Sequence, residues 1–99
     1  MIKEKEKDNL YAELISKGGL ESQMCLAVEE CAEFIQAVNK LRRAKTTKEM
    51  NKRTDELRGE IADVLNTMEQ MRFVFGKLEV DNIRMQKFER VKKLIAKNE

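Results

Sequence analysis

Two pairs of acidic residues have the types and spacing needed to hold a divalent cation. Glu30 and Glu33 lie in the stretch VEECAEFIQA, and Glu60 and Asp63 lie in the stretch GEIADVLNTM. Residues three apart share one face of a helix, so each pair can direct two carboxylates to the same side. Carboxylate oxygens are hard ligands that suit Mg²⁺ and leave coordination positions for water or phosphate oxygens. The spacing therefore predicts a Mg²⁺ site, in which Mn²⁺ could substitute.

The helical positions of these acids favour a cation over simpler explanations. Turning each residue by about 100° places Glu30 inside the apolar arc of its helix and Glu33 at the edge of that arc. Glu60 and Asp63 border the apolar row of the next long helix in the same way, and four converging carboxylates would repel one another unless a cation lay between them. Two alternatives stay open, ordinary surface acids and interhelical salt bridges to Arg53, Arg58 or Arg72.

The elements that must position these acids are helices. The chain of 99 residues has no proline and no tryptophan, and residues with unbranched side chains that favour helices dominate it. The pattern predicts four helices, at about Glu4 or Asp8 to Lys17, Leu20 to Arg43, Thr47 to Phe75 and Val80 to Lys97. Gly18, Gly19 and Gly76 supply the stops, and Thr46 with Glu49 forms a capping box.

Apolar residues at alternating steps of three and four predict a packing seam on each of the two long helices. One seam is Met24, Val28, Cys31, Ile35 and Val38, and the other is Met50, Leu57, Ile61, Val64, Met68, Met71 and Phe75, with Thr54 counted as a weak member between Met50 and Leu57. Because the connection between these helices is short, they should pack antiparallel. We expect one all-α domain over residues 1–99: a four-helix, bundle-like chain with two long central antiparallel helices and shorter N- and C-terminal helices, completed by oligomerisation.

Composition narrows the classes of partner. A chain this small buries a modest fraction of its surface alone, so a homodimer or homotetramer is expected. The net charge of +2, from 20 basic and 18 acidic residues, is too balanced to indicate nucleic acid as a partner. No stretch resembles a signal peptide or a membrane span, which favours a cytoplasmic location without membrane attachment. The chain has no histidine, and Cys25 and Cys31 fall on different helix faces, so neither zinc nor a disulfide is expected.

At the acidic pairs the sequence resembles a known superfamily. The residues EECAE and then EIAD, which are Glu30-x-x-Glu33 followed by Glu60-x-x-Asp63, are similar to the E-x-x-E and E-x-x-D motifs of the MazG-like all-α nucleoside triphosphate pyrophosphohydrolases. The resemblance covers about Glu21 to Phe75. It implies cleavage between the α- and β-phosphates of a (deoxy)nucleoside triphosphate, giving the monophosphate and pyrophosphate in nucleotide-pool house-cleaning. It also implies that these four acids are both the Mg²⁺ ligands and the catalytic groups, and it leaves the preferred nucleotide open.

Other polar residues near the acids are candidates for substrate contacts. Basic side chains at the end of the second helix could grip a triphosphate, Gln23 could contact a base edge, and Asn66 lies one turn beyond Asp63. The candidates are Gln23, Lys40, Arg43, Lys45 and Asn66. Glu29 or Glu56 could support the metal ligands from an outer shell, while Tyr11 is expected to pack in the core rather than stack on a base.

A reading without catalysis is also consistent with the pattern. The chain could be a helical module that dimerises through its seams and binds a partner, or DNA through the stretch KLRRAKTTK. That basic stretch lacks interleaved aromatic residues, and the adjacent acids would repel phosphate unless a metal were bound. The enzyme is therefore the favoured hypothesis.

Overall fold

The computed structural model describes residues 1–98, and this part of the chain consists of four α-helices joined by short connections. The helices are α1 (Glu4–Gly18), α2 (Leu20–Arg42), α3 (Thr47–Phe75) and α4 (Lys77–Asn98). The predicted all-α class, the number of helices and their boundaries to within a few residues are confirmed. None of the described helices is both long and apolar enough to cross a membrane.

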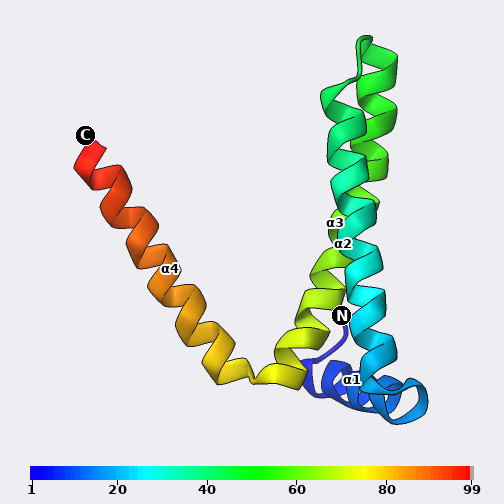
Figure 1. Ribbon diagram of the computed structural model, residues 1–99, viewed down its shortest axis with the longest axis vertical. Coiled ribbons are helices and arrows are strands. Elements are labelled where there is room, and N and C mark those ends of the chain that lie inside the picture. The colour runs from blue at the N-terminus through cyan, green and yellow to red at the C-terminus, as the bar shows by residue number, and fades with distance from the viewer. Residues whose placement is uncertain (99) are drawn as a thin grey trace.

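The two long helices form an antiparallel hairpin, as predicted (Figure 1). The turn between them is held by the predicted capping residues. The Glu49 amide donates to the Thr46 hydroxyl at 3.1 Å, and the Glu49 carboxylate accepts from the Lys45 amide at 2.8 Å. In the usual capping box this carboxylate would accept from the amide of the N-cap residue, Thr46. Here it accepts from the amide of the preceding residue, Lys45.

The hairpin contact is built from small and polar residues rather than from the predicted seam of α2. The side chains buried on these helices are those of Gln23, Ala27, Ala37, Thr67 and Gln70. Val28 and Ile35 were expected to pack against α3, yet they are 69% and 58% exposed. That prediction was wrong for the contact within one chain, because α2 turns its small residues toward α3 and keeps its larger apolar residues on another face.

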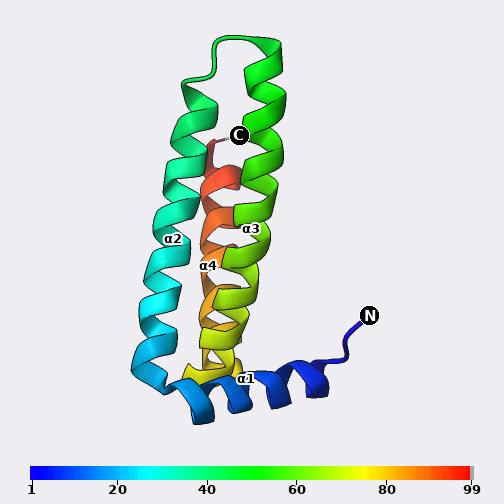
Figure 2. The same cartoon turned by 90° about the vertical axis from the view of Figure 1, so that its right-hand side faces the viewer.

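Helix α1 crosses the base of the hairpin (Figure 2). Tyr11 is buried there, and its ring lies 5.9 Å from that of Phe73 between centroids. The expectation that Tyr11 packs in the core is therefore confirmed. Lys7 adds an ion pair from α1 to Glu69 of α3 at 3.3 Å.

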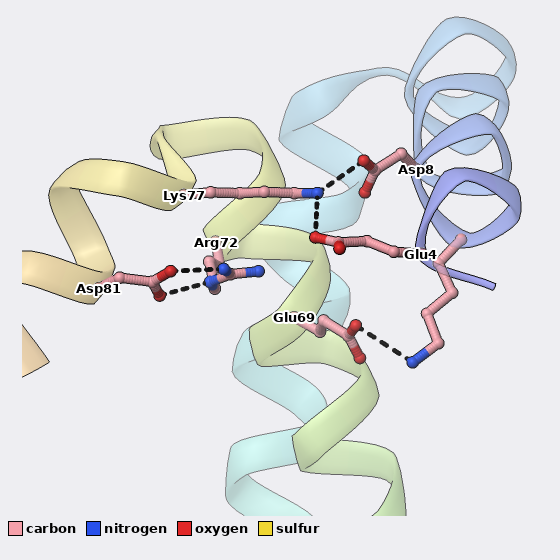
Figure 3. A network of polar contacts seen from close by, with 7 residues as sticks. Glu4, Asp8, Glu69, Arg72, Lys77 and Asp81 are labelled. Carbon is pink, nitrogen blue, oxygen red and sulfur yellow. Dashed lines mark hydrogen bonds and ion pairs between the residues drawn. The ribbon is translucent and has the colours of Figure 1, made fainter.

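A network of ion pairs fixes the junction of α1, α3 and α4 (Figure 3). The Arg72 guanidinium donates two hydrogen bonds to Asp81, at 2.7 and 2.6 Å, and so ties the end of α3 to the start of α4. These bonds hold the pKa of Asp81 below its ordinary value. Lys77 contacts Glu4 at 2.8 Å and Asp8 at 2.6 Å, which ties the start of α4 to α1.

Helix α4 leaves the hairpin at a single residue, Gly76, and extends away from it (Figure 1). Gly76 has φ 111° and ψ 108°, a conformation that side chains with a Cβ rarely adopt. None of the 22 described residues of α4 is buried. Within one chain, the four helices therefore form a hairpin with two appendages rather than a closed bundle.

Two glycine substitutions should change stability in opposite directions. Gly76→Ala should lower the free energy of unfolding by about 1–2 kcal/mol, because residues with a Cβ rarely adopt its positive φ. Gly59→Ala should raise it by about 0.5–1 kcal/mol, because Gly59 lies inside α3 with no atom near the added methyl. Urea unfolding of both variants at one protein concentration measures the difference. Equal effects of the two substitutions would contradict the geometry described for Gly76.

Candidate metal centre

Three of the four predicted acids meet between α2 and α3. Glu30 comes from α2, Glu60 and Asp63 come from α3, and one carboxylate oxygen of each lies within 4.8 Å of the others. The antiparallel hairpin produces this convergence. Glu30 points from α2 toward α3, Glu60 points from α3 toward α2, and the two residues lie at the same height along the hairpin. No other group of three or more potential ligand residues occurs in residues 1–98.

Two of these carboxylates carry oxygens that the protein leaves without partners. Glu30 and Glu60 are half-buried, and the Oε2 atom of each is buried without a hydrogen bond. An unpaired polar atom in such a place is unfavourable, so native proteins usually give it a protein, water or ion partner. Asp63 is exposed and completes the group on the solvent side.

Burial and mutual repulsion change the protonation of the half-buried pair. The pKa of Glu30 is raised by burial and then by the charges of Asp63, Glu33 and Glu60. The pKa of Glu60 is raised by burial and by the charges of Glu33 and Asp63, and Lys40 partly offsets this effect. Both shifts have the sign expected for carboxylates gathered without a compensating cation.

The structure argues against the salt-bridge alternative. Arg53 bonds both oxygens of Glu56 at 3.1 Å, Arg58 pairs with Asp55 at 2.9 Å, and Arg72 pairs with Asp81. Among the described residues, no ion pair reaches Glu30, Glu33, Glu60 or Asp63. The three arginines that could have neutralised the cluster are thus engaged elsewhere.

Glu33 lies at the margin of the cluster. It is exposed and is not among the three residues whose oxygens converge, but its charge raises the pKa of both Glu30 and Glu60. At about 100° per residue, Glu33 is turned about 60° from Glu30 around α2, and Asp63 is turned by the same angle and sense from Glu60 around α3. In an antiparallel pair equal turns reach the same side, so Glu33 and Asp63 define one side of the hairpin, the acidic flank.

Several large exposed apolar residues lie on the opposite side. Relative to Glu30 and Glu60, they are turned by about 80° to 160° in the other sense. They include Val28 and Ile35 of α2 and Ile61, Leu65 and Met68 of α3, and the half-buried Cys31 lies among them. We call this side the apolar flank.

Two of the predicted substrate residues, Lys40 and Arg43, lie together near the tip of the hairpin. They line a hollow of about 280 Å³ with Arg53, Glu49 and Ala44, so three cationic side chains and one carboxylate border it. The charge of Lys40 also lowers the pKa of Glu60, against the larger effects that raise it. Arg53 was not among the predicted substrate residues. Its position two turns before Glu60, on the same row of α3, could have indicated that it lies on this side of the helix.

The remaining predicted substrate residues lie elsewhere. Gln23 is buried between the helices, where its Oε1 accepts a hydrogen bond from Gln70 at 3.0 Å. Lys45 is exposed in the hairpin turn. Asn66 lines a cleft between α3 and α4, apart from the three converging acids. Of the two outer-shell candidates, Glu29 is exposed and adds negative charge near Glu30, and Glu56 is held by Arg53.

The raised pKa values predict how stability depends on pH in chelator. Above the ordinary Glu value of 4.5, the folded chain retains protons on Glu30 and Glu60 that the unfolded chain releases, so rising pH removes stability. From pH 5 to pH 7, the melting temperature of the wild type should therefore fall relative to that of Glu30→Gln. With Mg²⁺ the trend should reverse, because a cation binds the deprotonated carboxylates. Parallel pH profiles for the two proteins in chelator would contradict the assigned repulsion.

Comparisons of the chain with protein-family models, with curated protein sequences and with solved structures give no significant match.

Proposed function

We propose that this chain is a Mg²⁺-dependent nucleoside triphosphate pyrophosphohydrolase of the MazG-like type, acting in the cytoplasm to remove (deoxy)nucleoside triphosphates from the nucleotide pool. The observation that carries the proposal is the meeting of Glu30, Glu60 and Asp63, with two buried carboxylate oxygens that have no partner. The order of the acids along the two helices, which resembles that superfamily, supports the same assignment.

The donor set fits Mg²⁺ and the similar ion Mn²⁺. All three converging groups are carboxylates, which are hard oxygen donors, and they come from two helices that fix their spacing. Glu30 and Glu60 would offer their unpartnered oxygens from inside the hairpin, and Asp63 would offer an oxygen from the acidic flank. With Glu33 close by, the site could hold a cation and leave its solvent side open to phosphate oxygens.

The metal and the residues around the cluster would have separate roles in the reaction. When bound, Mg²⁺ would neutralise phosphoryl charge and make the α–β bridge easier to break. Glu33, exposed beside the half-buried acids, would orient a water molecule and accept its proton as the water attacks phosphorus. Lys40 and Arg43 would hold the negative charge of the departing pyrophosphate.

The direct test is a panel of (deoxy)nucleoside triphosphates, assayed for pyrophosphate and monophosphate with Mg²⁺, with Mn²⁺ and with chelator. The proposal expects both products in equal amounts from at least one nucleotide, only when the metal is present, and no reaction of the monophosphate. The proposal does not specify which base is preferred, so the panel must include nucleotides of all common bases in their ribose and deoxyribose forms.

A further inference from the structure

Helix α4 carries an apolar face that its own chain does not cover. Val80, Val91 and Ile95 recur at helical spacing on this face, and Val91 and Ile95 are 50% and 57% exposed. Phe88 at its edge is 63% exposed. In proteins, most of the stability of an amphipathic helix comes from packing its apolar side against another surface. The apolar face of α4 therefore indicates a contact with another surface.

The apolar face of α4 looks toward the apolar flank of the hairpin without closing on it. Val80 and Arg84 of α4 line a cleft of about 680 Å³ with Leu65 and Met68 of the apolar flank. Beyond this elbow the two arms diverge, as the open V in Figure 1 shows. Farther along the same flank, Val28 and Ile35 line an apolar hollow on α2. One V thus presents two uncovered apolar surfaces that face one another across an opening.

The amount of exposed surface is too large for an isolated compact chain. The accessible area is 8189 Å², whereas a compact monomer of 11.6 kDa would expose about 5,800 Å². The radius of gyration is 17.1 Å, against about 13 Å for a compact domain of this length. The excess of about 2,300 Å² is well above the roughly 800 Å² that each partner buries in a standard interface.

Charge favours a second copy as the partner. Helix α4 has seven basic and three acidic residues, a net charge of +4, while α1, α2 and α3 together have a net charge of −4. The basic excess of α4 lies from Arg84 onward, and beyond the elbow α4 diverges from its own hairpin (Figure 1). A second hairpin entering the V would place a basic helix against a body of opposite net charge, in both directions, as a two-fold interface requires.

The elbow opposes the alternative in which α4 folds back onto its own hairpin. Only Gly76 separates α3 from α4, and the two Arg72–Asp81 hydrogen bonds hold the first turn of α4 in place. The ion pairs of Lys77 with α1 fix the same turn from the other side. Closing the V within one chain would require these contacts to break.

We propose that two copies of this chain exchange their α4 helices. The V of each copy receives the hairpin of the other, and each α4 lies along the apolar flank of its partner in a two-fold symmetric dimer. The acidic flank stays outside this contact, so the dimer stands independently of the proposed enzyme activity. A failure of one proposal therefore leaves the other intact.

A matched pair of substitutions on α4 tests the dimer by light scattering with size-exclusion chromatography at micromolar concentration. Phe88→Glu puts a charge at the edge of the apolar face, whereas Met85→Glu puts the same charge on the polar face beside Gln86 and Glu89, at nearly equal exposure of 63% and 61%. The wild type and Met85→Glu should be dimers, and Phe88→Glu should raise the dimer dissociation constant at least about a hundredfold. A monomeric wild type, which would leave the face to a different protein, or equal behaviour of the two variants would overturn the proposal.

Crosslinking between two tagged copies tests the exchange itself. One coexpressed copy keeps Cys31 on the apolar flank as its sole cysteine through Cys25→Ser, and the other carries only Val91→Cys in a background without native cysteines. A short bismaleimide should join the two tags, and Met85→Cys in place of Val91→Cys should join them far less. A dimer that gives no product between the tags would overturn the exchange. So would a third variant, carrying Cys31 and Val91→Cys in one chain, if the reagent joined these two cysteines within that chain.

Discussion

Asp63→Asn is expected to lower Mg²⁺-dependent pyrophosphate release by on the order of a hundred- to a thousandfold while the protein keeps its helicity and melting temperature. The substitution removes one ligand charge at nearly constant volume. Asp63 is exposed, so its loss should not disturb the hairpin. Steady-state kinetics across Mg²⁺ concentrations measures the effect, and part of the lost rate should return at high metal concentration, because a weakened cation site can still be filled.

The matched control is Asp55→Asn. Asp55 lies two turns earlier on the same helix, its side chain is 77% exposed, and it pairs with Arg58 outside the acidic cluster. This variant makes the same chemical change and should keep wild-type kinetics within a factor of about two, since surface ion pairs contribute little. Equal activity of the two variants would remove Asp63 from the site.

The second large effect concerns stability. Glu30→Gln should leave the melting temperature of the metal-free protein unchanged or raise it, because it removes one of several repelling charges beside the hairpin contact. The same variant should lose most of the stabilisation that Mg²⁺ gives the wild type. A cation at a hundredfold excess over its dissociation constant stabilises the folded state by about 2.7 kcal/mol. For a domain of this size, that corresponds to a shift of roughly 10–20 °C.

Melting curves of both proteins in chelator and in millimolar Mg²⁺ separate the metal site from a structural role for Glu30. If Glu30 were paired with a cation of the protein, its replacement would strand that cation and lower the melting temperature in chelator. A wild type that does not respond to Mg²⁺, together with a strongly destabilised Glu30→Gln, would contradict the metal centre.

The local signals in the sequence predicted the helices well. Thr46 and Glu49 marked the start of α3, and Gly76 marked its end, because capping and left-handed glycine depend on a few neighbouring residues. The short turn then required α2 and α3 to be antiparallel. With that geometry fixed, helical spacing alone was enough to bring Glu30 toward Glu60 and Asp63.

The face that α2 turns toward α3 could not be predicted by counting apolar residues. The pattern of Val28, Cys31 and Ile35 indicates an apolar contact, but it does not say whether the contact lies within one chain or between two. In the structure, Ala27 and Ala37 face α3, where small side chains let the helices approach and bring the acids together. The larger apolar residues stay exposed on the hairpin. They are available for a contact with another chain, which the pattern of one sequence does not distinguish from a contact within the chain.

Two further features depend on tertiary geometry. The direction of α4 follows from the φ and ψ of Gly76 and from the Arg72–Asp81 pair, and the identity of a glycine does not specify its dihedral angles. The buried hydrogen bond between Gln23 and Gln70 joins residues that are distant in the sequence, so only the folded hairpin shows that Gln23 has a partner.

The measurement that tests the central claim most directly is product analysis with a complete panel of (deoxy)nucleoside triphosphates, comparing the wild type with Asp63→Asn and Asp55→Asn. We predict that at least one nucleotide yields monophosphate and pyrophosphate in equal amounts with Mg²⁺, that chelator stops the reaction, and that only Asp63→Asn loses it. Absence of metal-dependent turnover across the whole panel, or products that are diphosphate and orthophosphate, would contradict the proposed pyrophosphohydrolase.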